Sequence, residues 1–171
     1  METEHLTLRP LTEADEAAVL ALHADPEVMR HLDPAPVTRY LRGGHLAAVE
    51  KTTGRFIGWF EFRDAGGGVV ELGYRLRREF WGRGYATEGG RALIAHGFTS
   101  GEVQRVVATT MAVNTASRRV MEKCGLRYVR TFHVDFPDPL PGAEQGEVEY
   151  ALTKVEWHRS QGERRVADGI S

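Results

Sequence analysis

The sequence predicts an α/β domain of the α+β kind, in which strands and helices surround one core. Three consecutive strand-like segments without a helix between them indicate an antiparallel meander, and a helical repeat follows them. The chain of 171 residues has 42% hydrophobic and 27% charged residues, which suits one folded domain. We therefore place a single domain at residues 1–159 and a polar C-terminal tail, frayed from Ser160, at 160–171.

In the first half of the chain, a helical segment follows the first strand. Thr12–Asp15 has the spacing of a capping box, and apolar residues carry the helix to about Ala24. Pro26 opens a further helical turn, which Pro34 and Pro36 end. Alternating apolar and polar residues predict strands at Leu6–Pro10, Leu46–Glu50, Arg55–Phe62 and Val69–Leu76, with a glycine-rich turn at Asp64–Gly68.

The second half begins with a long helix in which small and apolar residues from Ala86 onward share one face. A shorter helix is expected at Thr115–Cys124, with Ala116, Val120, Met121 and Cys124 turned inward. Gly125 stands where a left-handed residue commonly ends a helix. Further strands are predicted at Val103–Thr110, Leu126–Phe136 and Glu147–Thr153.

Charge and cysteine content exclude several classes of function. The formal net charge of −2 does not favour binding to nucleic acid. A single cysteine, Cys124, excludes an internal disulfide and a cysteine-based metal site, and the seven histidines lack metal-ligand spacing. The N-terminal segment Met1–Arg9 has no long apolar run, so neither a signal peptide nor a membrane span is expected. These features predict a cytoplasmic protein without a metal.

The stretch Phe80–Glu88 reads FWGRGYATE and lies between a strand and the start of a helix. Free N–H groups and the helix dipole favour an anion there, and glycines allow close approach, so the loop suits a phosphate or pyrophosphate. A P-loop would need Lys and then Ser or Thr where Tyr85 and Ala86 stand, and a dinucleotide fingerprint would need a small residue in place of Thr87. A plain tight turn is the alternative for this loop taken alone.

Four short motifs follow one another along the chain: Gly73–Leu76, Trp81–Glu88, Asn114–Ser117 and Glu122–Leu126. Together they resemble the GNAT superfamily of N-acetyltransferases, and within it the RimJ/RimL-like branch, over roughly Leu6 to Trp157. The resemblance implies a GNAT fold, a mixed and mostly antiparallel sheet of about seven strands flanked by helices. Trp81 stands where Arg or Gln often begins the loop motif, and Trp is common in this branch.

The same resemblance implies acetyl-CoA as co-substrate. The backbone around Leu76 would pair with the pantetheine arm, and N–H groups from Arg83 to Thr87 would hold the pyrophosphate. Asn114 would contact the pantetheine region, and the helix after it would flank the thioester. The residues assigned to the cofactor are Leu76, Gly82, Arg83, Gly84, Tyr85, Ala86, Thr87, Asn114 and Ser117.

Acetyl transfer to an amine needs a base and a proton donor for the departing thiolate. Glu71 is the candidate base, on the strand that would run to the thioester, although an ordinary ion pair with an arginine is its alternative interpretation. Further candidates for the base are Asp135, Glu147 and Glu149. The resemblance implies that the amine attacks the thioester directly, without a covalent enzyme intermediate.

Many GNAT members donate a proton to the thiolate from a tyrosine, and the matching position here is Met121. Ser117, one helical turn earlier, is therefore the candidate donor to sulfur, with a backbone hydrogen bond as its alternative role. Cys124 falls on the apolar helix face and is expected to be a buried structural thiol rather than a nucleophile.

The predicted function is transfer of an acetyl group from acetyl-CoA to a primary amine in a ternary complex. The acceptor is either a protein N-terminus, such as that of a ribosomal protein, or a small amine. The missing tyrosine at Met121 keeps a non-catalytic acyl-CoA-binding or sensor domain as the alternative. A homodimer is compatible with the sequence, whereas nucleic acid and membrane are not expected partners.

Overall fold

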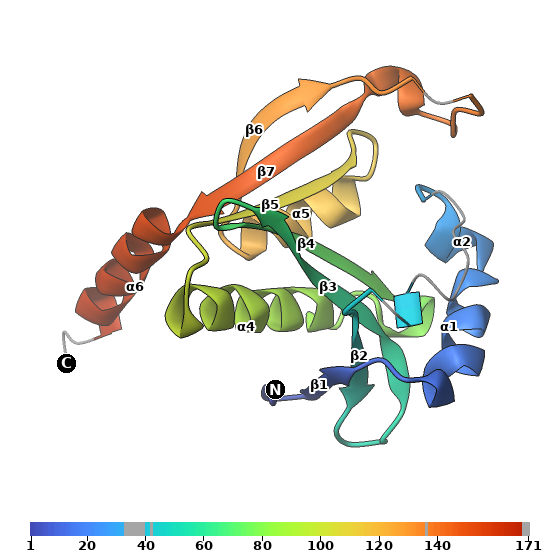
Figure 1. Cartoon of the computed structure of the whole chain (residues 1–171), viewed down its shortest axis with the longest axis horizontal. Coiled ribbons are helices and arrows are strands. Elements are labelled where there is room, and N and C mark those ends of the chain that lie inside the picture. The colour runs from blue at the N-terminus through green and yellow to red at the C-terminus, as the bar shows by residue number, and fades with distance from the viewer. Residues whose placement is uncertain (33–39, 42, 136, 169–171) are drawn as a thin grey trace.

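The computed structural model describes residues 1–32, 40–41, 43–135 and 137–168. Within them, one sheet has the strand order β1-β2-β3-β4-β5-β7-β6, and every neighbouring pair is antiparallel except β4 with β5 (Figure 1). This confirms the mixed, mostly antiparallel sheet of seven strands. The strands are β1 Leu6–Pro10, β2 Leu46–Glu50, β3 Phe56–Gly66, β4 Val69–Leu76, β5 Arg105–Met111, β6 Arg127–Phe132 and β7 Glu147–Thr153.

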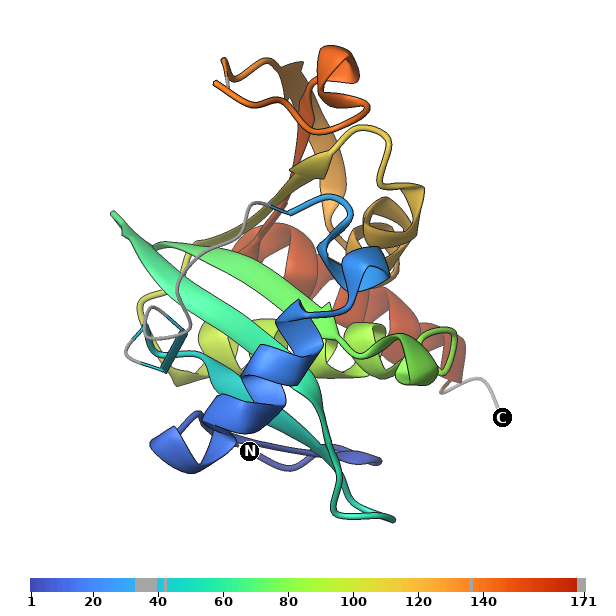
Figure 2. The same ribbon diagram turned by 90° about the vertical axis from the view of Figure 1, so that its right-hand side faces the viewer.

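Helices cover both faces of this sheet. Residues of α4 and α5 pack on one face in the larger apolar cluster, whereas α1 and α2 pack on the other face against β2 and β3. In Figure 2, α1 and α2 are the helices nearest to the viewer. The helices are α1 Glu16–His23, α2 Pro26–Met29, α4 Tyr85–Ser100, α5 Thr115–Lys123 and α6 Lys154–Asp168, with 3₁₀ turns at Glu13–Asp15, Arg78–Phe80 and Ala143–Gln145.

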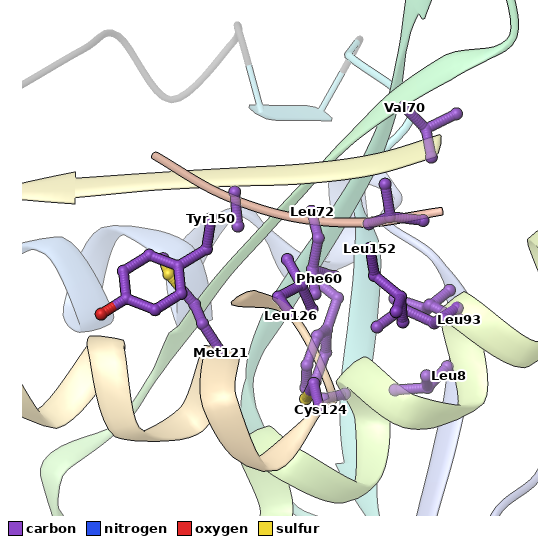
Figure 3. Packing of buried hydrophobic residues seen from close by; sticks show 14 of the residues in the cluster. Leu8, Phe60, Val70, Leu72, Leu93, Met121, Cys124, Leu126, Tyr150 and Leu152 are labelled. Atoms are coloured by element: carbon purple, nitrogen blue, oxygen red, sulfur yellow. The ribbon is translucent and has the colours of Figure 1, made fainter. Parts of the chain in front are cut away.

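Three glycines let α4 lie unusually close to the sheet. A Cβ atom on Gly89 would stand 2.3 Å from the Phe60 ring, and one on Gly90 would stand 2.8 Å from the sulfur of Cys124. A Cβ on Gly97 would likewise meet the ring of Phe62 at 2.7 Å. Figure 3 shows Phe60 and Cys124 gathered in this core. The glycines therefore fix where the N-terminus of α4 stands relative to the sheet.

Most predicted elements are confirmed, and the capping box at Thr12–Asp15 forms: the Asp15 carboxylate accepts a hydrogen bond from the Thr12 N–H at 2.9 Å. β3 runs to Gly66, so the predicted turn at Asp64–Gly68 is shorter than expected. Gly125 has a φ of +95°, as its position after α5 predicts. The proposed helix break at Pro34 and Pro36 lies outside the described residues. The strand predicted at Leu126–Phe136 is too long, because β6 ends at Phe132 and residues 133–135 are not in a strand.

Two predictions about helices are wrong. Ala116 is exposed rather than turned inward, because α5 presents Met121 and Cys124 to the core and the first turn of the helix faces away. The frayed tail expected from Ser160 is instead the second half of α6, which continues to Asp168. Glu156 caps this helix by accepting hydrogen bonds from Thr153, and Trp157 anchors it against Phe98 at a ring distance of 5.6 Å.

Candidate active site

The strands β4 and β5 separate at the centre of the sheet. They pair over three positions only, of which Glu71 with Val107 is the last, whereas β4 continues to pair with β3 as far as Leu76. Figure 1 shows the two strands diverging beyond this point. The edge of β4 from Leu72 to Leu76 that faces β5 therefore has no strand partner, and its backbone groups are available to an extended ligand.

The predicted anion loop ends at the N-terminus of α4. Gly82 and Gly84 have φ angles of +73° and +85°, and a Cβ atom on either would meet nothing within 4 Å. Gly84 is the N-cap, and no side chain of the described residues caps the helix. The N–H groups that open α4, from Tyr85 to Thr87, precede its first intrahelical hydrogen bond and favour an anion. The loop thus combines open space with free donors.

Side chains of the loop are held away from this space. The Tyr85 hydroxyl donates to Glu50 at 2.6 Å, and the Arg83 guanidinium lies 3.7 Å from the same carboxylate and over the ring of Phe80. Hydrogen bonds from Thr53 and then from Tyr85 lower the pKa of Glu50, so this carboxylate stays ionised. The cofactor assignments to Arg83 and Tyr85 therefore rest on backbone N–H groups, because their side chains are engaged elsewhere.

Trp81 joins the loop to the end of β4. Its indole Nε1 donates to the carbonyl oxygen of Leu76 at 2.8 Å. The Leu76 carbonyl, which we expected to meet the pantetheine arm, thus already accepts one hydrogen bond and keeps one lone pair. Trp81, which we noted as common in the RimJ/RimL-like branch, therefore also holds the glycine loop against β4.

Asn114 and Ser117 lie together at the start of α5. The Asn114 side-chain oxygen accepts from the Ser117 N–H at 3.2 Å, and its amide donates to Thr110. The Ser117 hydroxyl lies 2.9 Å from the hydroxyl of Tyr74, which reaches across from β4. Burial raises the pKa of Tyr74, so its proton stays on the oxygen. Two hydroxyl groups thus meet beside the unpaired edge of β4.

From the sequence we expected Tyr74 either to pack or to line the acceptor pocket, and we did not predict its contact with Ser117. Strand alternation could have found it, because Leu72, Tyr74 and Leu76 share the face that α4 and α5 cover. Met121 itself is buried in the apolar core. Tyr74 of β4 thus places a hydroxyl beside the start of α5, whereas Met121 on α5 has none.

Glu71 is not brought together with Ser117. Its side chain projects from the opposite face of β4, where it pairs with Arg63 of β3 and accepts from the Thr109 hydroxyl at 3.3 Å. The ion pair that we weighed against catalysis is therefore present, although 28% of the Glu71 side chain remains exposed. Glu71 is the last residue of β4 that pairs with β5, so it lies where the two strands begin to separate.

The remaining carboxylates proposed as the base differ in their surroundings. Glu149 on β7 lies 2.9 Å from Arg130 and 3.5 Å from Arg105, and Asp135 is exposed beyond the end of β6. Glu147 also lies on β7 and makes contacts of its own. Each of the three thus lies on or beyond the far strands of the sheet, away from the unpaired part of β4.

A carboxylate that the sequence analysis missed lies nearer to that part. Glu61 of β3 stands opposite Gly73, and a Cβ atom on Gly73 would be 3.2 Å from its Oε2. Its carboxylate lies 3.1 Å from Arg63 and 3.8 Å from the ring of His45. Alternation along β3, with Phe60 and Phe62 facing the core, could have placed Glu61 on the same face as Glu71.

Cys124 is buried in the core, and its burial raises the pKa of the thiol to about 11. Thiolate is therefore scarce at neutral pH, as expected of a structural cysteine. In the described part of the chain, no three His, Cys, Asp or Glu side chains gather in an arrangement that could hold a metal ion. No helix among the described residues is long and apolar enough to cross a membrane.

This geometry agrees with what comparison with known proteins shows. Residues 5–127 match the family model for the acetyltransferase (GNAT) domain. The chain belongs to the GNAT acetyltransferase family. The fold implied by the motifs is thereby confirmed, and so is the seven-stranded, mostly antiparallel sheet flanked by helices.

Similar proteins include an FsC-acetyl coenzyme A-N(2)-transacetylase of Aspergillus fumigatus, which is 33% identical over 94% of this chain and 79% of its own length. A GNAT-family acetyltransferase from Bacillus anthracis has a similar fold, with a TM-score of 0.78 and 24% identity over 91% of this chain and 99% of its own. RimL, a ribosomal-protein acetyltransferase solved with coenzyme A, gives a TM-score of 0.74 at 18% identity, over 88% and 95% of the two chains.

Proposed function

We propose that this protein transfers an acetyl group from acetyl-CoA to a primary amine, by direct attack of the amine in a ternary complex. The proposal rests on two features that occur together: the edge of β4 that has no strand partner, and the N-terminus of α4 that has no side-chain cap. A pantetheine arm fits the first and a pyrophosphate fits the second. The A. fumigatus relative is named for an acetyl coenzyme A reaction at nitrogen, which supports the same chemistry.

The residues around these two features fit the cofactor. Backbone N–H groups from Gly82 to Thr87 would hold the pyrophosphate, since a side chain at either glycine would enter the open space. The backbone near Leu76 and the side chain of Asn114 would contact the pantetheine arm. Bound acetyl-CoA supplies the activated thioester, and the chain's own groups supply the proton transfers.

The proton donor to the leaving sulfur would be the pair of hydroxyls on Ser117 and Tyr74. Their separation of 2.9 Å would let the Tyr74 hydroxyl orient Ser117 by a hydrogen bond while Ser117 donates one to the sulfur. The base would be a carboxylate on the other face of β4. Glu71 keeps this role as a proposal, and Glu61 is its competitor because it lies opposite Gly73, beside the unpaired part of the strand.

We infer that the chain falls in the RimJ/RimL-like branch, for which Trp81 and the similarity in fold to RimL are the support. In that case a protein N-terminus or a small amine is the acceptor. We also place the reaction in the cytoplasm, because a single buried cysteine suits a reducing compartment.

An acceptor screen tests the proposal. Purified protein and acetyl-CoA are incubated with N-terminal peptides, polyamines and amino acids, and release of the free thiol of coenzyme A is followed. We expect turnover with at least one amine. We expect this turnover to be lost in the double variant Ser117→Ala, Tyr74→Phe. Tight coenzyme A binding by calorimetry, with no acetylated amine in any reaction, would instead identify a non-catalytic sensor domain.

A further inference from the structure

A buried arginine lies on the face of the sheet that α1 and α2 cover. Arg75 is only 7% exposed. Its side chain projects from β4 on the same side as Gly73 and Glu71. The guanidinium lies 4.9 Å from the centre of the Trp59 ring and 5.4 Å from that of Tyr40, so two aromatic faces wall it in.

The hydrogen bonds of this guanidinium are poor for a buried charge. Nη1 donates to the thioether sulfur of Met29 at 3.3 Å and to the Tyr40 hydroxyl at 3.5 Å. Nε is buried and has no hydrogen-bond partner in the described part of the chain. Thioether sulfur is a weak acceptor, so Nε has no partner and Nη1 has only poor ones.

The ionisable neighbours do not balance this charge. His23 is held neutral, since burial first, and then Arg75 and His45, lower its pKa to about 4. The nearby carboxylate of Glu61 is directed to Arg63 and His45 instead. Burial also lowers the pKa of Arg75, yet arginine stays charged in proteins. No carboxylate among the described residues forms an ion pair with Arg75, which is costly for a buried cation.

A cavity borders this aromatic cluster. A cavity of about 280 Å³ opens where α1 and α2 meet the segment Arg77–Glu79. Leu22 and Val28 line the cavity and also pack in the cluster that contains Trp59 and Tyr40. The cavity is thus separated from the rings around Arg75 by Leu22 and Val28, and Arg75 belongs to this smaller cluster's surroundings rather than to the main core.

We propose that Arg75 binds a carboxylate of the acceptor, so that the substrate is an amine that also carries a carboxylate. This rests on the proposed function and narrows its acceptor. A planar carboxylate matches the guanidinium fork and would satisfy both Nε and the adjacent Nη. The aromatic rings of Trp59 and Tyr40 would exclude water from this pair and strengthen it.

The position of Arg75 on β4 also sets the length of such a substrate. Strand residues rise about 3.3 Å each, so Gly73, with Glu61 over it, lies roughly 7 Å from Arg75, and Glu71 lies about 13 Å away. A carboxylate on Arg75 thus brings an amine several bonds away to Glu61. Amino acids with a chain of about four to six carbons, counting the carboxyl carbon, have this reach. An amine without the acid would leave Arg75 without an ion-pair partner.

Matched acceptors provide the test. We would compare kcat/KM for 6-aminohexanoate and for its uncharged amide, 6-aminohexanamide, on the wild type, Arg75→Gln and Arg75→Lys. The wild type should prefer the acid by about 10²-fold or more, because a site built for a polar group rejects an analogue that lacks it. Arg75→Gln should abolish the preference, and Arg75→Lys should keep part of it. Arg30→Gln, a change at a 67% exposed arginine, should behave as the wild type.

Binding without turnover separates this proposal from the proposed function. With coenzyme A bound, 6-aminohexanoate should raise the melting temperature of the wild type and of Arg30→Gln, but not that of Arg75→Gln. If the melting temperature rises in this way but no amine is acetylated, the carboxylate site is supported and the transferase activity is rejected. Equal kcat/KM for acid and amide in the wild type would overturn the carboxylate site while the transferase stands, and this comparison holds even if the Arg75 variants do not fold.

Discussion

The two sides of β4 would recognise the ligands proposed for them by different means. On the cofactor side, the proposed contacts are backbone groups at Gly82–Thr87 and an unpaired strand edge, and the side chains of Arg83 and Tyr85 are turned to Glu50. On the acceptor side, the distinctive groups are side chains, with Arg75 between Trp59 and Tyr40. Backbone recognition tolerates changes of side chain, whereas side-chain recognition can change substrate with a single substitution. We expect the cofactor side to be common to relatives and the acceptor side to set specificity.

The sharpest test of the backbone side is Gly84→Glu. A carboxylate there would occupy the open space and repel the pyrophosphate, so coenzyme A binding by calorimetry should weaken by more than about 10³-fold, in line with roughly 4 kcal/mol of lost anion contacts. Gly84→Ala is the control. It should cost about 1–2 kcal/mol of stability from its positive φ and yet keep most of the affinity. Equal affinity in wild type and Gly84→Glu would move the cofactor elsewhere.

The hydroxyls of Tyr74 and Ser117 lie between the proposed cofactor and acceptor sides, and variants of both test their proposed role. Tyr74→Phe and Ser117→Ala should each lower kcat by about 10²-fold, and the double variant should lose little more, because groups that act as a unit are not additive. Coenzyme A affinity should change little. Tyr128→Phe, at a 53% exposed tyrosine of β6, is the matched control. Independent losses that multiply in the double variant would show that the two hydroxyls do not act as a unit.

The carboxylates test the acceptor side. Glu71→Gln should lower kcat by about 10²-fold near neutral pH, and the loss should shrink as pH rises, since an amine with a pKa near 10 then arrives deprotonated. Glu61→Gln is measured beside it over the same pH range. A pH-dependent loss in Glu61→Gln alone would assign the base to Glu61, and a flat response in both would assign it to another carboxylate or to water.

The smallest effect is expected in the core that supports both sides. Cys124→Ala should lower the free energy of unfolding by roughly 1 kcal/mol in denaturant titrations, with turnover kept. Gly90→Ala, whose new methyl would meet the Cys124 sulfur, should destabilise more in the wild type than in the Cys124→Ala background. An acetylated protein trapped on Cys124 in the wild type, and absent from the variant, would contradict direct attack.

What could be predicted from the sequence follows the same division. The bounds of β2, β4 and β7 were predicted to the residue because their alternation is local. The glycine loop before α4 could be recognised because its chemistry lies in one continuous segment. α6 was missed although Thr153 and Glu156 have the spacing of a capping box, because the polar residues after Ser160 were taken as a tail.

The acceptor side could not be predicted in this way. Arg75, Trp59 and Tyr40 come from separate segments, and each side chain is unremarkable in its own sequence context. Their meeting depends on the register of β3 with β4 and on the packing of α2 over both strands. The pairing of Tyr74 with Ser117 spans 43 positions for the same reason. Periodicity gives the face on which a residue lies, but only the fold shows which residues share it.

The early separation of β4 and β5 has a consequence for the design of inhibitors. The free edge of β4 offers amide groups at the repeat distance of a polypeptide, and it carries no information about adenine or ribose. A short peptide-like compound could therefore engage this edge without imitating a nucleotide. If it also carried a carboxylate spaced to reach Arg75, it would span the proposed pantetheine and acceptor sites, and it would compete with coenzyme A for the strand edge without needing contacts to the anion loop.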